Sequence, residues 1–175
     1  DFRITDDFLD PPESDTSCYS EESERITSFW CYRAAEDAGA VAELPQIAAG
    51  HITFGCLNNF RKASQETIRL WAEILKRAPD SRLIVVARGG RDGTLIAYIH
   101  EQFARHGVQP DRLEILGIQP QLAYFDSYND IDLGLDPFPF NSGTTGYDSI
   151  WMGVPYVTLP GDMLVSRMGK AILEN

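Results

Sequence analysis

The chain has 175 residues, of which 43% are hydrophobic and 11% aromatic, enough for one globular domain with a packed core. Its net charge of −11 argues against nucleic-acid binding, which requires clustered lysine and arginine side chains. No apolar run approaches the roughly 18 residues of a membrane span, so we expect no membrane association.

The cysteines and the ends of the chain give two further expectations. Cys18, Cys31 and Cys56 are odd in number and lack CxxC spacing, so neither a disulfide framework nor a metal site is predicted. A reducing cytoplasm fits such cysteine usage best. Because the chain begins with Asp1 and stops at "AILEN", we expect it to be a piece of a longer protein.

Residues 1–49 differ in composition from the rest of the chain. Nine acidic residues and a single base, Arg3, precede Arg25. The stretch "DPPESDTSCYSEESE" is polar and rich in turn-forming residues, and its two prolines disfavour regular structure. We therefore expect an acidic, partly irregular segment, with a short strand at "ITSFWCY" (26–32) and a linker at 33–50.

From residue 51 onward, apolar runs that predict strands alternate with amphipathic runs that predict helices. Ser64 is placed to cap the first of these helices, and Gly107 to end the second. Strands are expected at 51–58, 82–87, 113–116, 131–136 and 155–160, and helices at 64–81, 94–107, 121–129 and within 141–155.

Strict alternation of strands and helices predicts an α/β fold: a Rossmann-like parallel sheet with helices on both faces. The apolar strand "LIVVA" (83–87) agrees, because a strand that is buried on both faces needs a continuous rather than an alternating pattern. Ligands of such sheets bind at the carboxyl ends of the strands, near the point where the strand order reverses. Candidate binding residues are therefore sought in the loops that follow the strands.

The stretch "NSGTTGYDSIWMGVP" (141–155) follows the fourth strand. Thr144 or Thr145 could cap the helix that begins here, and Thr145 with Asp148 has the spacing of a capping box. The start of a helix also offers N–H groups and a partial positive charge, which suit a phosphate. Gly143 would let such a group approach the backbone closely. The local pattern fits both a capped helix and an anion pocket.

Two other loops carry candidate residues. In "CLNNFRKAS" (56–64), Asn58, Asn59 and Lys62 lie at the expected carboxyl end of the first strand. An ammonium there could neutralise a departing phosphate, although surface charges are the commoner case. In "GIQPQLAY" (117–124), the polar side chains could read a base or a ribose, or could form an ordinary surface turn. They are Gln119, Gln121 and Tyr124. The turn "ARGGRDG" (87–93) lacks both GxGxxG and the P-loop pattern, which disfavours an oxidoreductase or an NTPase.

Three stretches together resemble the catalytic region of the O-GlcNAc transferase family, and its bacterial members in particular. They are "FGCLNNFRKASQETIRLWAEILKRAPDSRLIVV", "LDPFPFNSGTTGYDSIWMGVPYVTLPG" and "SRMGKAIL". Members are two-lobed glycosyltransferases of the GT-B type, usually preceded by tetratricopeptide repeats. The resemblance implies that residues 1–49 are the end of the amino-terminal lobe and a linker. It implies that residues 50–175 are the Rossmann-like nucleotide-sugar-binding lobe, truncated at its carboxyl end.

The resemblance implies a diphosphate site on two loops. Lys62 matches the lysine that contacts the donor diphosphate, and Asn59 falls where the animal enzymes carry glutamine. Thr144 and Thr145 match the paired threonines at the diphosphate, and Gly143 replaces the histidine that precedes them in the animal enzymes. Lys62 is thus the implied catalytic residue.

The nucleoside site is implied less closely. Asp148 matches the aspartate that binds the ribose, while Gln121 and Tyr124 replace the lysine and histidine of the animal enzymes. These departures leave the nucleotide and the sugar open: UDP-GlcNAc is expected, and relatives use UDP-glucose or GDP-fucose.

The implied reaction is inverting transfer of GlcNAc from UDP-GlcNAc to serine or threonine of an acceptor protein. Lys62 and the helix start would stabilise the leaving diphosphate in place of a divalent cation, so no metal and no cofactor are expected. The family's amino-terminal lobe contributes a histidine and is largely missing, so we expect the fragment alone to be inactive. Alternatives are a non-catalytic interaction domain and a Rossmann-like domain for another nucleotide.

Overall fold

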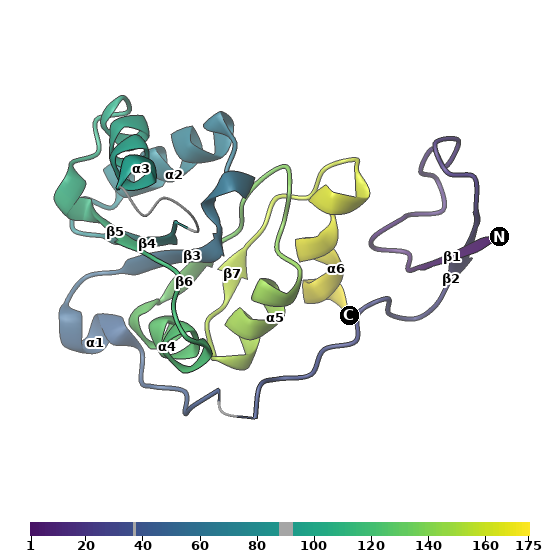
Figure 1. Ribbon diagram of the computed structural model, residues 1–175, viewed down its shortest axis with the longest axis horizontal. Coiled ribbons are helices and arrows are strands. Elements are labelled where there is room, and N and C mark those ends of the chain that lie inside the picture. Colours follow the sequence, from purple (N-terminus) through teal and green to yellow (C-terminus); the bar gives the residue numbers. More distant parts are fainter. Residues whose placement is uncertain (37, 88–92) are drawn as a thin grey trace.

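The computed structural model describes residues 1–36, 38–87 and 93–175 (Figure 1). The glycine-rich turn expected at 88–93 lies outside the described residues, except for Gly93.

Within the described residues, the centre of the molecule is a five-stranded parallel sheet, which confirms the predicted fold class. Its strands lie in the order β5-β4-β3-β6-β7, so that the order reverses at β3. They are β3 (Thr53–Asn59), β4 (Arg82–Val86), β5 (Leu113–Leu116), β6 (Leu133–Leu135) and β7 (Tyr156–Val157). The gap between the loops after β3 and β6 is thus where a ligand is expected.

Helices cover both faces of this sheet, as Figure 1 shows. Along β4, Leu83 and Val85 face a core formed with α2 (Gln65–Arg77) and α3 (Thr94–Ala104). The intervening Ile84 and Val86 face a second core formed with α4 (Gln121–Asp126) and with the residues that follow α5 (Thr144–Trp151). Burial on both faces explains why the strand is apolar at successive positions.

The helix ends follow the expected signals in two cases. Ser64 caps α2, and its side chain accepts a hydrogen bond from the backbone N–H of Thr67. Gly107 has a φ of +82°, three residues beyond the end of α3 at Ala104, where only glycine turns without strain.

The acidic amino-terminal segment contains more structure than its composition suggests. Strands β1 (Phe2–Thr5) and β2 (Glu22–Arg25) pair in parallel. Between them, the buried Asp6 carboxylate accepts backbone N–H groups of Phe8, Leu9 and Phe29, and so fixes the turn.

The expected strand at 26–32 is wrong, because β2 ends at Arg25 and irregular chain follows. The aromatic residues that gave this run its strand-like pattern pack on one another and on α5 instead of on a sheet. Trp30 and Tyr32 both contact the ring of Tyr147, with Tyr32 stacked on it at 5.0 Å between centroids.

Short helices complete the fold. Helix α1 (Pro45–Ala49) lies inside the expected linker, and α6 (Met168–Glu174) packs beside α5. The 3-10 turns are η1 (Phe60–Lys62), η2 (Pro110–Arg112), η3 (Ser127–Asp130) and η4 (Leu164–Ser166). Among the described residues, no helix has the length and apolar character needed to cross a membrane.

Candidate functional site

The loops after β3 and β6 meet at the carboxyl edge of the sheet, next to the start of α5. An isolated bridge between Ala63 and Pro139 joins the two loops. The Thr67 hydroxyl strengthens the junction by donating to the carbonyl of Phe138 at 2.7 Å. Residues that are far apart in sequence are thereby held side by side.

Lys62 lies in this junction, at the end of η1. Its Nζ donates to the Asn58 Oδ1 at 3.3 Å and to the Asn141 carbonyl at 3.1 Å, and it lies 4.2 Å from the centroid of the Phe140 ring. Burial lowers the pKa of Lys62, and the negative charge of Asp136 opposes that shift. In the described part of the chain, no carboxylate lies within ion-pair distance of Nζ, so this ammonium is available to an anion.

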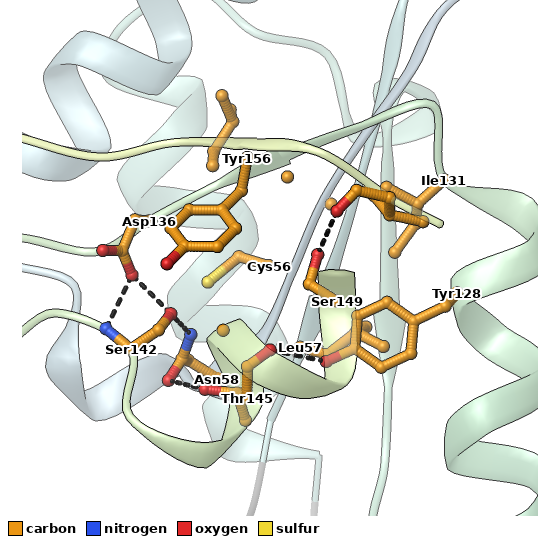
Figure 2. Close-up of a pocket in the computed structure, with 15 residues that line it drawn as sticks. Cys56, Leu57, Asn58, Tyr128, Ile131, Asp136, Ser142, Thr145, Ser149 and Tyr156 are labelled. Carbon is orange, nitrogen blue, oxygen red and sulfur yellow. Dashed lines mark hydrogen bonds between the residues drawn. The ribbon is translucent and has the colours of Figure 1, made fainter. Parts of the chain in front are cut away.

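A chain of hydrogen bonds runs from Asp136 to the start of α5 (Figure 2). The Asp136 Oδ1 accepts the Ser142 backbone N–H at 2.7 Å and the Ser142 hydroxyl at 2.5 Å. Ser142 Oγ accepts from the Asn58 Nδ2 at 2.7 Å, and the Asn58 Oδ1 accepts from the Thr145 hydroxyl at 2.7 Å. Burial raises the pKa of Asp136, although the bonds from Ser142 and Thr158 and the charge of Lys62 lower it in part.

The cavity enclosed by these residues is not itself a nucleotide site. Figure 2 shows it between β3, β6 and α5, where it has a volume of about 20 Å³, room for roughly one water molecule. A larger ligand would therefore bind outside it, near Thr145, which lines the cavity, and Lys62, which shares the Asn58 Oδ1 with Thr145.

The expected capping of α5 by threonine is wrong. The helix begins after Gly143, and no described side chain caps it. Thr144 and Thr145 already lie in the first helical turn, and Thr145 gives its hydroxyl proton to Asn58. The capping box fails for the same reason, because the Asp148 carboxylate is bonded elsewhere.

Asp148 is buried and held by two tyrosine hydroxyls from distant parts of the chain. Tyr32 donates to Oδ1 at 2.8 Å, and Tyr124 donates to Oδ2 at 2.7 Å. Tyr128 lies behind them, bonded to the Tyr124 hydroxyl at 2.8 Å and to the Thr145 carbonyl at 3.1 Å. Burial, together with the neighbouring carboxylate, raises the pKa of Tyr32 above its ordinary value.

Beyond Asp148, the carboxyl ends of β4 and β5 open into a second cavity of about 220 Å³. It is lined by Val86, Gly117, Ile118, Gln119, Gln121 and Tyr124. Tyr124 belongs both to this cavity and to the hydrogen bonds around Asp148. A continuous row of polar groups therefore leads from the cavity, through Asp148, to Thr145 and Lys62.

Comparison with known proteins identifies the family of this arrangement. The sequence model of the family described as Glycosyl transferase family 41 matches residues 39–175. The chain belongs to glycosyl transferase family 41.

Relatives agree with that assignment. The chain is 35% identical to a rice (Oryza sativa subsp. japonica) protein named probable UDP-N-acetylglucosamine–peptide N-acetylglucosaminyltransferase SPINDLY, over 99% of this chain and 19% of the rice protein. A mutant O-GlcNAc transferase of Thermobaculum terrenum superposes with a TM-score of 0.89 at 33% identity, over 99% of this chain and 33% of that one. The resemblance to O-GlcNAc transferases is confirmed, and this family 41 chain spans about a fifth of the rice relative.

Of the nine expected residues of this family 41 chain, six lie along this row: Lys62, Tyr124, Thr145 and Asp148, with Gln119 and Gln121 in the cavity at its end. Asn59, Gly143 and the exposed Thr144 do not. Asn59 turns away and accepts the backbone N–H of Arg61 at 3.2 Å, so it caps η1. Gln119 accepts from the Ser127 hydroxyl, Gln121 is exposed, and Gly143 lies next to the Trp30 ring. Among the described residues, no group of three or more His, Cys, Asp or Glu side chains could hold a metal.

Three residues of the site were not predicted from the sequence: Tyr32, Asp136 and Ser142. Asn58 was expected beside Lys62 at the carboxyl end of the first strand, but its hydrogen bonds to Ser142 and Thr145 were not. Asp136 follows an apolar strand, so the rule that ligands bind at carboxyl ends could have found it. Nothing in the sequence signals Tyr32, because its contact with Asp148 spans 116 residues.

Proposed function

We propose that this chain is the donor-binding lobe of an inverting protein glycosyltransferase that transfers GlcNAc from UDP-GlcNAc to serine or threonine hydroxyls. The single observation that carries the proposal is the position of Lys62. Its ammonium lies at the switch point of the sheet beside the first turn of α5 and has no carboxylate partner in the described residues.

The row of polar groups supports a nucleotide sugar as the ligand. The 220 Å³ cavity would take the base, with Tyr124 against its ring and Gln119 and Gln121 near its polar edge. Asp148 would accept the ribose hydroxyls, and the diphosphate would lie against Thr145 and Lys62. The order of these groups along the edge matches the order of base, ribose and diphosphate in the donor.

The reaction would proceed by attack of the acceptor hydroxyl on the anomeric carbon as the UDP diphosphate departs. Negative charge grows on the leaving oxygen in the transition state, so groups that bind this charge accelerate the step. Lys62 and the backbone N–H groups at the start of α5 would supply that stabilisation.

Relatives support a peptide acceptor and a UDP-GlcNAc donor, since the rice protein is named for this reaction. UDP-glucose and GDP-fucose remain the alternative donors, because the cavity wall differs from that of the animal enzymes at Gln121 and Tyr124. A non-catalytic interaction domain is the alternative of another class. It would not need an ammonium placed beside a helix start.

The test is transfer by the whole protein that contains this chain, offered UDP-GlcNAc, UDP-glucose or GDP-fucose with a serine/threonine peptide. We expect transfer from UDP-GlcNAc, with Lys62→Met lowering kcat by about 10²- to 10³-fold. Lys76→Met is the matched control, because Lys76 pairs with Glu73 on the outer face of α2. Transfer from GDP-fucose alone would overturn the assignment of UDP-GlcNAc as the donor. If the protein bound no nucleotide, the result would support a non-catalytic interaction domain.

A further inference from the structure

Asn58 occupies the centre of the site without being exposed to it. The residue is 5% exposed and lies near the end of β3, and Figure 2 shows its side chain between Ser142 and Thr145. Its amide makes hydrogen bonds to three side chains from both sides of this junction.

The two ends of the Asn58 amide have different partners. The Oδ1 accepts from the Lys62 ammonium at 3.3 Å and from the Thr145 hydroxyl at 2.7 Å. The Nδ2 donates to Ser142 Oγ at 2.7 Å. Lys62 and Thr145 sit on different elements, and this shared acceptor is what joins their side chains.

The orientation of the Asn58 amide is fixed by Ser142 and Asp136. Ser142 must accept from Asn58, because its own hydroxyl proton goes to the Asp136 carboxylate at 2.5 Å. Asp136 in turn is held by the Thr158 hydroxyl on its other oxygen, at 2.6 Å. The buried carboxylate thus directs Nδ2 toward Ser142 and leaves Oδ1 facing Lys62 and Thr145.

We propose that Asn58 is a positioning residue for phosphoryl-group binding, which sets the separation of the Lys62 ammonium and the Thr145 hydroxyl around one amide oxygen. The inference rests on the proposed function, because it concerns the same diphosphate. Asn58 does not touch the donor: it acts through the two groups that do. A misplaced Lys62 costs more when the diphosphate carries its full leaving charge than when it is still esterified to the sugar.

The experiment measures UDP binding by calorimetry and steady-state kinetics on the whole protein for Asn58→Ala. We expect a loss of UDP affinity and of kcat of about 10-fold to 100-fold, while KM for the UDP-sugar changes about threefold or less. Asn58→Asp is the second variant, because it is isosteric and keeps an acceptor. It loses donation to Ser142 and adds a negative charge beside the diphosphate, so UDP affinity should fall at least as far.

A double-mutant cycle separates positioning from simple support of the fold. If Asn58 acts through Thr145, the variant Asn58→Ala/Thr145→Ala should bind UDP about as weakly as the worse single variant. Asn129→Ala is the matched control, because this amide lies in η3 and, in the described structure, bonds only to the backbone at Ala40 and Ala42. The fold-losses of UDP affinity caused by Asn129→Ala and by Thr145→Ala should multiply in the double variant, because the two sites are independent.

The outcomes distinguish this inference from the proposed function. A purely structural Asn58 would reduce the number of UDP sites per chain and leave Kd unchanged, which would overturn the inference. The inference would also be overturned if the losses of UDP affinity from Asn58→Ala and Thr145→Ala multiplied in the double variant. If Lys62→Met weakens UDP binding but Asn58→Ala does not, the proposed function stands and the positioning role fails. If the wild-type protein binds no UDP, both fail.

Discussion

Both carboxylate oxygens of Asp148 accept hydrogen bonds from tyrosine hydroxyls, from Tyr32 at 2.8 Å and from Tyr124 at 2.7 Å. Each oxygen has a further lone pair, but Asp148 is buried, so we expect a ribose to reach it only by displacing one of these hydroxyls. We expect Tyr32 to be the more readily displaced, because it lies on irregular chain, whereas Tyr124, which is equally half-buried, belongs to α4.

We therefore expect Tyr32→Phe to strengthen UDP binding by about threefold, since one net hydrogen bond no longer has to be displaced. The stacked Tyr147 ring should keep the phenylalanine in place. Calorimetric titration with UDP checks the direction. Tyr98→Phe is the control, because its hydroxyl bonds to Gln65 on the outer surface. Weaker binding in Tyr32→Phe would mean that Tyr32 stays on Asp148 and orients it for the ribose.

The second residue-scale prediction concerns pH. Burial lowers the pKa of Lys62, so this side chain loses its proton below the usual lysine range. The charge proposed to bind the diphosphate therefore disappears as pH rises through this lowered pKa. Neighbouring groups should not obscure the change. Burial raises the pKa of Cys56 to about 12 and that of Tyr128 well above its ordinary value.

UDP affinity should accordingly fall on the alkaline side with a slope of about one proton, beginning below the pH at which ordinary lysines titrate. Lys62→Met should bind more weakly at neutral pH and show no such fall. The measurement is Kd for UDP from pH 7 to 10. An alkaline fall that persists in Lys62→Met would assign the titration to another group.

At the scale of elements, α6 approaches the sheet closely at one glycine. A Cβ on Gly169 would overlap the Thr158 hydroxyl and the Asp136 carboxylate, which are hydrogen-bonded to each other at 2.6 Å. Gly169→Ala should therefore cost about 1–3 kcal/mol of unfolding free energy and separate these two groups. Urea denaturation checks the loss. Gly117→Ala is the control, because a Cβ there meets nothing within 4 Å. Equal stability of the two variants would show that α6 can move away.

The sequence predicted the elements of the sheet better than the contacts made by its loops. Strand β5 matches its expected range, and α2 begins at its expected cap, because apolar periodicity and a serine before a helix are local signals. The capping of α5 was wrong because the Thr145 hydroxyl finds a better partner 87 residues away, in Asn58. The strand at 26–32 was wrong because aromatic packing on α5 replaced pairing in a sheet.

The same contrast holds for the site. Lys62, Thr145 and Asp148 were expected from their loops and from the family resemblance, and the structure does place them along one edge. The bonds that link them could not be predicted, since Asn58, Ser142 and Tyr32 act across elements that only the fold brings together.

At the scale of the whole molecule, the amino-terminal strands lie apart from the main sheet, beyond α6 in Figure 1. The chain that leads from them runs along α5, where the Tyr147 ring contacts Tyr32 at 5.0 Å and Trp30 at 5.8 Å between centroids. Tyr32 also donates to Asp148 at 2.8 Å, and Arg167 donates to the Phe8 carbonyl at 2.8 Å. Segments held by so few contacts open locally before the core unfolds.

We expect Tyr147→Ala to accelerate amide hydrogen exchange in residues 22–36 by about tenfold, because two aromatic contacts worth about 0.5–1.5 kcal/mol each are lost. Exchange in β3, β4 and β5 should not change, since their cores draw almost entirely on residues beyond 50. Ile150→Ala is the matched control, because Ile150 is exposed on the same helix. Acceleration that extends equally through β3–β5 would mean that the segment and the sheet unfold as one unit. In that case Tyr32 could not leave Asp148 for a ribose without loss of the fold.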